Sequence, residues 1–216
     1  KFKRGHAVHH RKAMLGPEKV KPTFISRTDA VGIANGLAWT SVGGEMLPVE
    51  VAVIPNGSGK IEITGSLGDV MKESAQLAVT YAKVHAEEYG IPADKFKNTD
   101  LHIHAPEGAV PKDGPSAGVT LTTALVSALS GIPVRHDLAM TGEITLHGNV
   151  LPIGGLKEKS MAAFREGIST VLIPKDNASD LYEVDAEVKE KVQFIPVANL
   201  SEVLKHALVR SGRTPA

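Results

Sequence analysis

The stretch Pro111-Lys112-Asp113-Gly114-Pro115-Ser116-Ala117-Gly118 stands directly before a long apolar segment. In the segment 119–129, apolar residues recur at helical spacing, at positions 121, 124, 125, 128 and 129. Gly131 and Pro133 then follow, and both residue types commonly end helices. We therefore expect a helix that begins near Ser116, after a loop stiffened by two prolines.

Ser116 has two interpretations at this position. Free N–H groups at a helix N-terminus favour developing negative charge, so an oxyanion formed by attack of the Ser116 hydroxyl would find donors there. Serine is also a preferred N-cap, and Pro-Ser before a helix is a common way to begin one. The local sequence leaves both a nucleophile and a structural cap open.

The segment Gly114-Pro115-Ser116-Ala117-Gly118 also fits the Gly-x-Ser-x-Gly pattern of a nucleophile elbow. That motif requires a strand that runs directly into the serine, followed along the chain by an acid and a histidine. The preceding strand-like run, 101–105, is separated from Ser116 by a loop of ten residues. Histidines do follow Ser116, so this interpretation is weaker but open; they are His136, His147 and His206.

A lysine is the other candidate catalytic group. A short helix is expected over Leu156–Glu166, after a double glycine and before Gly167. An ordinary lysine is neutral in only roughly 1 molecule in 250 at pH 8, but burial lowers the pKa of the amine and makes it a usable base. A helical wheel places Lys157 nearer the apolar side of this helix than Lys159. The alternative for each of them is an ordinary solvated surface lysine, which is where lysines usually lie.

Three blocks of sequence together resemble the proteolytic domain of the bacterial Lon protease family. Matching segments run in order from about residue 30 to 207, which is a specific and extended likeness. The blocks are Pro111–Gly118, Thr141-Gly142-Glu143-Ile144-Thr145-Leu146 and Val150-Leu151-Pro152-Ile153-Gly154-Gly155-Leu156-Lys157-Glu158-Lys159, with further matches at 36–40, 42–44, 65–74 and 102–109.

The resemblance implies a Ser-Lys peptidase. The family nucleophile, the serine of Asp-Gly-Pro-Ser-Ala-Gly, falls on Ser116, and the family base, the fourth residue after the double glycine, falls on Lys159. Neither position departs from the family pattern. The resemblance therefore favours Lys159 over the Lys157 that the helical wheel prefers.

The resemblance also implies supporting roles for residues around this dyad. Thr141 is similar to the threonine whose hydroxyl orients the lysine, and Asp113 lies in the loop that shapes the substrate cleft. His104, which shares one strand face with His102, and Glu50 belong to the same group of residues. Their alternative roles are a loop turn for the aspartate, a β-branched strand residue for the threonine and cross-strand packing for the histidines.

Two other motifs do not hold up. Asn56-Gly57-Ser58-Gly59-Lys60 resembles a phosphate loop, but the full Gly-x4-Gly-Lys-[Ser/Thr] pattern fails, and a hairpin turn explains the segment. The His102-x-His104 pair has the chemistry of a zinc site, yet the chain has no cysteine and shows no third ligand at a suitable spacing. We expect no metal and no cofactor in this chain.

Composition limits the remaining function classes. The chain has 216 residues, 42% of them hydrophobic, which suits one domain with a full core. Lys plus Arg and Asp plus Glu number 24 each, so no global charge points to nucleic acid as a partner. The absence of cysteine excludes disulfides and thiol catalysis. With neither a signal-peptide pattern nor a long apolar run, we expect a soluble, cytoplasmic protein without membrane contact.

Three segments are expected along the chain. Residues 1–21 are basic and resemble, at Met14-Leu15-Gly16-Pro17, the linker that joins the Lon ATPase module to its protease module. A nucleic-acid arm is the less favoured interpretation of this basic segment. Residues 22–210 are expected to form the proteolytic domain, and 211–216 a tail. Because the chain starts at Lys1, we expect it to be a fragment of a longer protein.

The expected fold class is α+β, a mixed α/β domain similar to the ribosomal protein S5 domain 2-like fold that the resemblance implies. Helices and strands should alternate in a mixed sheet with packed helices. We expect strands near 36–41, 48–54, 60–64, 101–105, 170–173 and 192–195, a hairpin over 138–153 that turns at 147–149, and helices over 69–88, from 116, over 156–166, before 191 and from 200.

Two function classes remain. The first is a serine endopeptidase module of an ATP-dependent protease of protein quality control, acting on misfolded and short-lived regulatory proteins. Its ATP and Mg would bind a missing ATPase module, and the family assembles as hexameric rings. The second is a non-catalytic Lon-like domain that serves as a ring-forming scaffold. Such a scaffold needs neither Ser116 nor Lys159, and the chain has both.

Overall fold

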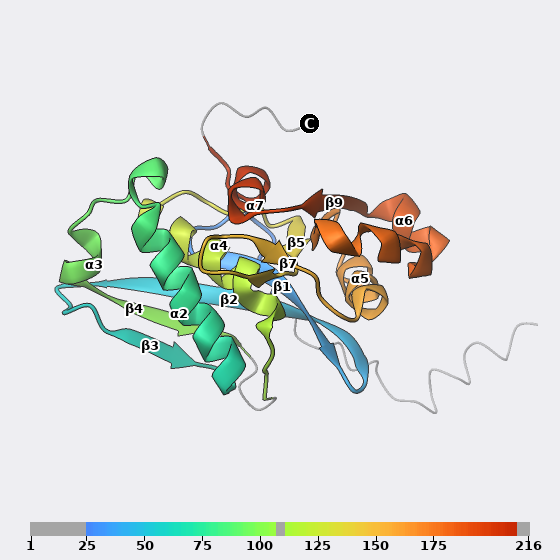
Figure 1. Ribbon diagram of the computed structural model, residues 1–216, viewed down its shortest axis with the longest axis horizontal. Coiled ribbons are helices and arrows are strands. Elements are labelled where there is room, and N and C mark those ends of the chain that lie inside the picture. Colours follow the sequence, from blue (N-terminus) through green and yellow to red (C-terminus); the bar gives the residue numbers. More distant parts are fainter. Residues whose placement is uncertain (1–24, 107–110, 211–216) are drawn as a thin grey trace, which may run out of the picture.

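The computed structural model describes residues 25–106 and 111–210, and the expected linker (1–21) and tail (211–216) lie outside them. A seven-stranded mixed sheet in the order β3-β4-β2-β1-β5-β8-β9 forms the centre (Figure 1). This arrangement confirms the expected mixed α/β class. The strands are β1 Ile33–Thr40, β2 Gly43–Pro55, β3 Ile61–Thr64, β4 Thr99–His104, β5 Leu138–Met140, β8 Thr170–Pro174 and β9 Gln193–Val197.

A separate two-stranded sheet corrects one expectation. β6 (Glu143–Ile144) and β7 (Val150–Leu151) form a short antiparallel hairpin whose loop contains the predicted turn at 147–149. The predicted hairpin over 138–153 is wrong in its first strand, because β5 lies in the main sheet, parallel to β1 and β8. β5 is buried throughout, so its apolar side chains place it in the centre of a sheet rather than in a surface hairpin.

Both faces of the main sheet are buried at β5 and β8. Side chains alternate between the two faces along a strand, and along β8 Leu172 joins one apolar cluster while Val171 and Ile173 join the other. β5 behaves in the same way, with Leu138 and Ala139 in different clusters. Two cores on opposite sides of one sheet explain why β8 is apolar at every position from 171 to 174 rather than alternating.

The larger core lies under α2 (Asp69–Val84), α4 (Gly118–Ser130) and α7 (Leu200–Ala207). Figure 1 shows α2 and α4 crossing the sheet on the same side. α4 is buried nearly all round, and its buried threonines bond back to the helix: Thr122 Oγ1 donates to the carbonyl of Gly118 at 2.8 Å. The smaller core lies under α5 (Leu156–Arg165), the 3-10 helix η3 (Lys175–Glu183) and α6 (Ala186–Lys191).

The β1–β2 pair extends beyond the rest of the sheet. β1 and β2 pair from Ile33–Glu50 to Thr40–Gly43, but β5 pairs with β1 only at Asn35 and Gly36. β4 pairs with β2 only from Glu50 onward. The segment from 37 to 46 is therefore a two-stranded ribbon, and α5 packs against the β1–β2 pair.

Several boundaries differ from the sequence prediction. The helix predicted over 69–88 ends at Val84, and a separate 3-10 turn, η1 (Glu87–Tyr89), follows it. The short helix α3 (Lys95–Asn98) was not predicted. Both elements are only one turn long, so apolar periodicity carries little information about them. In the described part of the chain, no helix is both long enough and apolar enough to cross a membrane.

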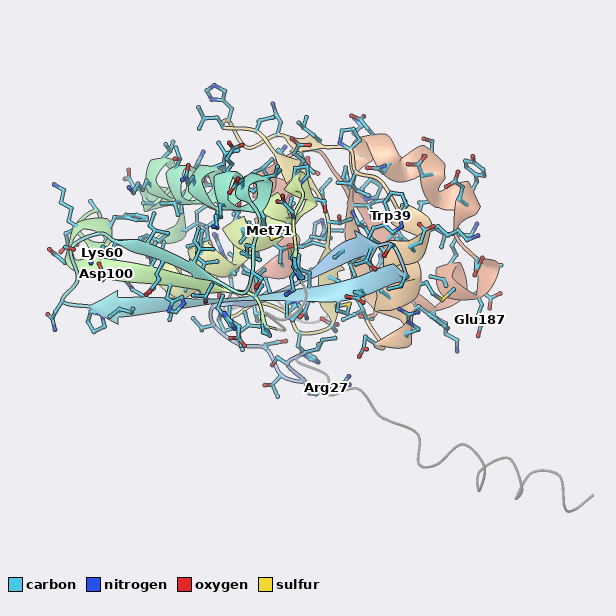
Figure 2. The ribbon with its side chains drawn as sticks, turned by 90° about the horizontal axis from the view of Figure 1, so that it is seen from below. Arg27, Trp39, Lys60, Met71, Asp100 and Glu187 are labelled. Atoms are coloured by element: carbon cyan, nitrogen blue, oxygen red, sulfur yellow. The ribbon has the colours of Figure 1, made fainter. Side chains whose placement is uncertain are left out.

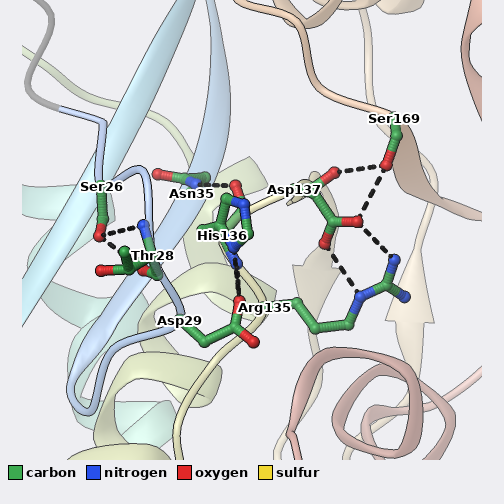
Figure 3. Close-up of polar contacts among 8 residues, drawn as sticks. All are labelled: Ser26, Thr28, Asp29, Asn35, Arg135, His136, Asp137 and Ser169. Atoms are coloured by element: carbon green, nitrogen blue, oxygen red, sulfur yellow. Dashed lines mark hydrogen bonds and ion pairs between the residues drawn. The ribbon is translucent and has the colours of Figure 1, made fainter. Parts of the chain in front are cut away.

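The segment that leads into β1 is fastened to the start of β5 (Figure 3). Asp29 Oδ1 accepts hydrogen bonds from the main-chain N–H of His136 at 3.0 Å and lies 2.6 Å from His136 Nδ1. These contacts, the backbone bond first, lower the pKa of the Asp29 carboxyl. Beside them Asp137 binds both Arg135 and Ser169. His136 therefore has a structural role where the central strands β1 and β5 begin.

Candidate active site

A cavity of about 350 Å³ opens where the β1–β2 ribbon, the loop before α4 and the turn before α5 meet. The ribbon contributes residues on both strands, and Met71 of α2 and Lys159 of α5 complete the lining. Figure 2 labels Trp39 and Met71, which come to this cavity from the ribbon and from the start of α2. Ser116 and Lys159, the two predicted catalytic residues, line the same cavity although they lie 43 residues apart in the sequence.

Ser116 lies in a one-turn 3-10 helix, η2 (Pro115–Ala117), that runs straight into α4. Gly114 begins it at φ 116° and ψ 164°, a conformation that side-chain-bearing residues rarely adopt. The chain can therefore turn sharply into the helix at this glycine. The predicted start of the helix near Ser116 is confirmed, and the serine is half-buried at its mouth.

The interpretation of Ser116 as an ordinary N-cap is wrong. The cap position of η2 is Gly114 and that of α4 is Ala117, and neither helix has a side-chain cap. The main chain of Ser116 is nevertheless held: its carbonyl oxygen accepts the N–H of Gly142 at 2.8 Å. The serine is fixed through its backbone, while its hydroxyl is not used to cap either helix.

Lys159 is buried, with 3% of its surface exposed, and Lys157 is exposed. This corrects the helical wheel, which took Met161 and Phe164 as the buried side of α5. Both of these are only partly buried. The buried face of α5 consists instead of one leucine, one lysine and three small residues: Leu156, Lys159, Ser160, Ala162 and Ala163.

Burial lowers the pKa of the Lys159 amine from 10.5 to about 8, because the charged form loses its hydration. Among the described residues no carboxylate forms an ion pair with it. Its Nζ instead donates a hydrogen bond to Thr141 Oγ1 at 3.2 Å, and Thr141 is itself 1% exposed. A lysine in this setting has a large neutral fraction near pH 8, as a general base requires.

Thr141 and Gly142 connect the serine to the lysine. Thr141 holds the Lys159 amine, and the next residue, Gly142, holds the Ser116 carbonyl. The N–H of Thr141 also donates to the carbonyl of Leu172 in β8 at 3.2 Å, which ties the link to the central sheet. A residue with a Cβ at position 142 would approach the Val150 side chain to 2.7 Å, so the close passage favours glycine.

Asp113 lies in the wall of the cavity and fastens the loop before Ser116 to α2. Its Oδ1 accepts the N–H of Met71, in the first turn of α2, at 3.0 Å, and the N–H of Gly114 at 2.8 Å. It therefore acts as an N-cap for a helix 42 residues earlier in the chain. Gly68 permits the approach, because a Cβ there would lie 2.3 Å from the Asp113 carboxyl carbon.

His104 and Glu50 do not line the cavity. They face each other across the β2–β4 pairing, and the His104 Nδ1 lies 2.7 Å from Thr64 Oγ1 on β3. His102 Nε2 lies 2.9 Å from the same hydroxyl. The structure thus places both histidines in a cross-strand polar cluster, the alternative that their alternation along the strand left open.

The hairpin turn predicted for Asn56–Lys60 is wrong, because β4 lies between β2 and β3 in the sheet and pairs with both. The phosphate-loop-like turn closes on Asp100, whose Oδ1 accepts the N–H groups of Ser58 and Lys60 at 2.9 Å each. These backbone bonds lower the pKa of Asp100, and Figure 2 shows Lys60 and Asp100 at the opposite end of the molecule from Trp39. Among the described residues, no cluster of three or more His, Asp or Glu side chains forms a metal site.

The histidines required by a nucleophile elbow are also elsewhere. His136 pairs with Asp29, and His147 lines a second surface hollow beside α7. Neither His136, His147 nor His206 lines the cavity that contains Ser116. The Gly-x-Ser-x-Gly pattern therefore does not correspond to a nucleophile elbow in this fold.

Sequence reasoning assigned no role to the apolar residues that shape the cavity. Trp39 is the only tryptophan of the chain and is 59% exposed, and it packs over the Gly154-Gly155 turn. Met46 and Met71 also line the cavity. The sequence shows only that the tryptophan is single; its contact with the double glycine joins segments more than a hundred residues apart and is visible only in the structure.

Comparison with known proteins agrees with this geometry. Residues 7–210 match the family described as the Lon protease (S16) C-terminal proteolytic domain. The chain belongs to this family. The expected resemblance to a Lon proteolytic domain is thereby confirmed.

Named relatives are similar along almost the whole chain. The Lon protease of Chloroflexus aggregans is 55% identical over 202 residues, which cover 94% of this chain and 24% of that protein. The Lon protease of Brevibacillus choshinensis is 54% identical over 198 residues, or 92% of this chain and 25% of that protein. Lon protease 1 of Syntrophobacter fumaroxidans is 55% identical over 195 residues, which cover 90% of this chain and 24% of that protein. The chain spans about a quarter of the length of these curated relatives.

Proposed function

We propose that this chain is the peptide-bond-hydrolysing module of a Lon-type ATP-dependent protease, with Ser116 as nucleophile and Lys159 as general base. The observation that carries the proposal is the setting of Lys159. Its amine is buried, has a pKa of about 8, is held by Thr141 and lines the same cavity as Ser116. A serine activated by a lysine can carry out acyl transfer without a histidine.

The proposed reaction begins when the Ser116 Oγ attacks the substrate carbonyl carbon. The neutral Lys159 Nζ takes the hydroxyl proton, and the carbonyl oxygen becomes an oxyanion. The C–N bond then breaks, the leaving amine takes the proton from Lys159, and an acyl-serine ester remains. Water attacks this ester by the same route, with Lys159 again as base, and releases the acid and the free serine.

Two features support the proton transfers and the charge that develops. The Thr141 hydroxyl accepts one Nζ–H, which orients the lone pair of the neutral amine away from Thr141. The η2–α4 helix begins at the serine, and its N-terminal N–H groups with the positive end of the helix dipole favour the oxyanion. Asp113 would hold the loop that presents these groups.

The substrate proposed for this cavity is an extended, unfolded peptide segment. Apolar residues of the ribbon and α2 suit an apolar side chain, whereas a folded protein would need to be unfolded first against several kcal/mol of stability. We assign that step to an ATPase module that binds ATP and Mg in the longer protein. Misfolded and short-lived regulatory proteins as substrates, a hexameric ring and a cytoplasmic location are parts of the same proposal.

The alternative, a non-catalytic scaffold, accounts less well for Lys159. A buried amine without an ion-pair partner among the described residues destabilises the fold, and a scaffold gains nothing from it. Enzymes commonly retain destabilising groups where the chemistry needs them.

Peptide hydrolysis tests the proposal. The chain should cleave an unstructured fluorogenic peptide, and Ser116→Ala should abolish cleavage while the circular dichroism spectrum stays unchanged, because this serine caps no helix. Ser58→Ala, an exposed serine at the far end of the molecule, should retain the wild-type rate. Equal rates for Ser116→Ala and wild type would refute the proposed nucleophile.

A further inference from the structure

The main chain at Ile153 is held by a side chain from a different element. Asn177, in η3, is 3% exposed, and its Oδ1 accepts the N–H of Ile153 at 2.8 Å while its Nδ2 donates to the carbonyl of Ile153 at 2.9 Å. One amide group therefore satisfies both main-chain groups of Ile153, as a neighbouring strand would. β7 ends at Leu151, so this contact takes over where strand pairing stops.

A third hydrogen bond fixes the orientation of the Asn177 amide. Its Nδ2 also donates to Asp180 Oδ2 at 2.7 Å. The Ile153 carbonyl and the Asp180 carboxylate can only accept, and the Ile153 N–H can only donate. Rotation of the amide by half a turn would set like groups against each other in all three contacts, so a single orientation is allowed.

Ile153 and its neighbours form part of the cavity that contains Ser116 and Lys159. Ile153 is partly buried, and Pro152, Ile153 and Gly154 all line the cavity. The chain then passes under Trp39, where a Cβ on Gly155 would lie 2.6 Å from the indole ring. Asn177 itself does not line the cavity, so any effect it has there passes through the main chain of Ile153.

We propose that Asn177 is a positioning residue for substrate binding, which fixes the segment Pro152–Gly154 as one wall of the peptide-binding cavity. This inference rests on the proposed peptidase function. Lys159 is held separately, by the packing of α5 on the β1–β2 ribbon and by Thr141. Loss of the Asn177 amide should therefore weaken peptide binding and leave the proton-transfer step intact.

The first measurement does not depend on catalysis. In Asn177→Ala the N–H of Ile153 loses its acceptor, and its amide hydrogen exchange, followed by NMR, should become at least about tenfold faster. The Lys159 N–H, which donates to the carbonyl of Gly155 at 2.9 Å, should keep its protection. Unchanged exchange at Ile153 would overturn the proposal.

The second measurement is peptide binding in a Ser116→Ala background, with a fluorescein-labelled unstructured peptide that has a central leucine. Asn177→Ala should raise the Kd about fivefold or more, since both hydrogen bonds to the cavity wall are gone. When Asn177→Ala is made in the active protein, which retains Ser116, KM should rise by a similar factor. The value of kcat should stay within about twofold, and its pH profile should be unchanged. An unchanged Kd, or a fall in kcat with KM unchanged, would overturn the proposal.

Matched variants separate positioning from general loss of structure. Ser179→Ala, exposed on the same helix, should match wild type, and Asp180→Ala, which leaves both bonds to Ile153, should change the Kd by less than Asn177→Ala does. Asn177→Asp places a carboxylate next to that of Asp180, so this variant should bind the peptide most weakly. The double variant Asn177→Asp with Asp180→Asn should recover part of the lost affinity. Absence of recovery would contradict the assigned contacts.

The same design distinguishes the two proposals. If the wild-type protein binds the peptide but does not cleave it, the proposed peptidase function fails. In that case the Kd and the Ile153 exchange still test Asn177. If cleavage depends on Ser116 but the Kd is insensitive to Asn177→Ala, the function stands and the positioning role fails.

Discussion

The main-chain N–H of Gly142 donates to the carbonyl oxygen of Ser116 at 2.8 Å. The residue before it, Thr141, accepts the hydrogen bond of the Lys159 amine. One dipeptide between β5 and β6 thus holds both proposed catalytic residues, and the Thr141 N–H is tied in turn to Leu172 of the central sheet. The relative position of the serine and the lysine is a property of the core rather than of a surface loop.

The rate of peptide cleavage should depend on the protonation of Lys159. Burial lowers the pKa of its amine to about 8, and only the neutral amine accepts the Ser116 proton. We expect kcat/KM to rise with pH between about 7 and 9, with a midpoint near pH 8. A profile that is flat over this range would show that another group, or none, acts as base.

The two lysines of α5 should behave differently. Lys159→Met should lower kcat/KM by at least about 10²-fold, as loss of a general base does, while Lys157→Met should retain most of the activity. Lys157 is exposed and shares no contact with Thr141. Steady-state rates of both variants on one fluorogenic peptide show which lysine is the general base. An inactive Lys157→Met together with an active Lys159→Met would assign the base to Lys157 instead.

Lys159→Met should also stabilise the fold. The folded-state pKa of Lys159 is lower than its ordinary value of 10.5, so between about pH 8 and 10.5 the unfolded chain binds a proton that the folded chain does not. The penalty of burying the amine is fully present below pH 8 and disappears as the pH rises toward 10.5. Lys159→Met should raise the free energy of unfolding at pH 7 by up to about 3 kcal/mol and by much less at pH 10.

Urea denaturation of both proteins at the two pH values measures this difference. Lys157→Met is the control and should show no pH-dependent gain, because its side chain is exposed. A Lys159→Met variant that is less stable than wild type at pH 7 would indicate that the amine is stabilised by a partner rather than destabilised by burial.

Thr141 should act through the lysine. Thr141→Val removes the hydroxyl that accepts the Nζ–H bond at nearly constant volume, and kcat should fall about tenfold or more while KM changes little. Thr141→Ser retains the hydroxyl and should recover most of the rate. The experiment is a comparison of kcat and KM for the two variants; equal rates in both would mean that the hydroxyl does not position Lys159.

Gly44 should control how closely α5 approaches the ribbon. A Cβ at this position would lie 1.9 Å from the carbonyl oxygen of Glu158, next to Lys159, and backbone on both sides prevents easy adjustment. Gly44→Ala should therefore reduce the free energy of unfolding by about 2 kcal/mol or more and also lower activity. Ser41→Ala, at the exposed tip of the ribbon, is the control. Wild-type stability in Gly44→Ala would contradict this packing.

Much of the fold could be predicted from local patterns. The apolar spacing after Ser116 predicts α4, and the strand-like runs predict β3, β4 and β8 to within a few residues. β5 was misassigned to a hairpin because pairing partners are not encoded locally: β5 pairs with β1, about a hundred residues earlier. A short apolar run is equally compatible with a hairpin and with the centre of a sheet.

The candidate site shows the same division. Ser116, Lys159, Thr141 and Asp113 were predicted from motifs through a resemblance, whereas periodicity alone favoured Lys157, which the structure shows to be exposed. Beside Leu156, the buried face of α5 consists of two alanines, a serine and Lys159, which give a much weaker hydrophobic pattern than Met161 and Phe164. The Asn177 contact with Ile153 and the Trp39 contact with the double glycine depend on tertiary structure and have no local signal.

Covalent labelling tests the central claim most directly. The chain is incubated with a fluorophosphonate that reacts with activated serines, and the modified peptide is identified by mass spectrometry at pH 7, 8 and 9. We predict a single adduct on Ser116, formed faster as the pH rises through about 8 and lost in Lys159→Met but not in Lys157→Met. An adduct on another residue, or labelling of Ser116 at an unchanged rate in Lys159→Met, would contradict a Ser116–Lys159 dyad.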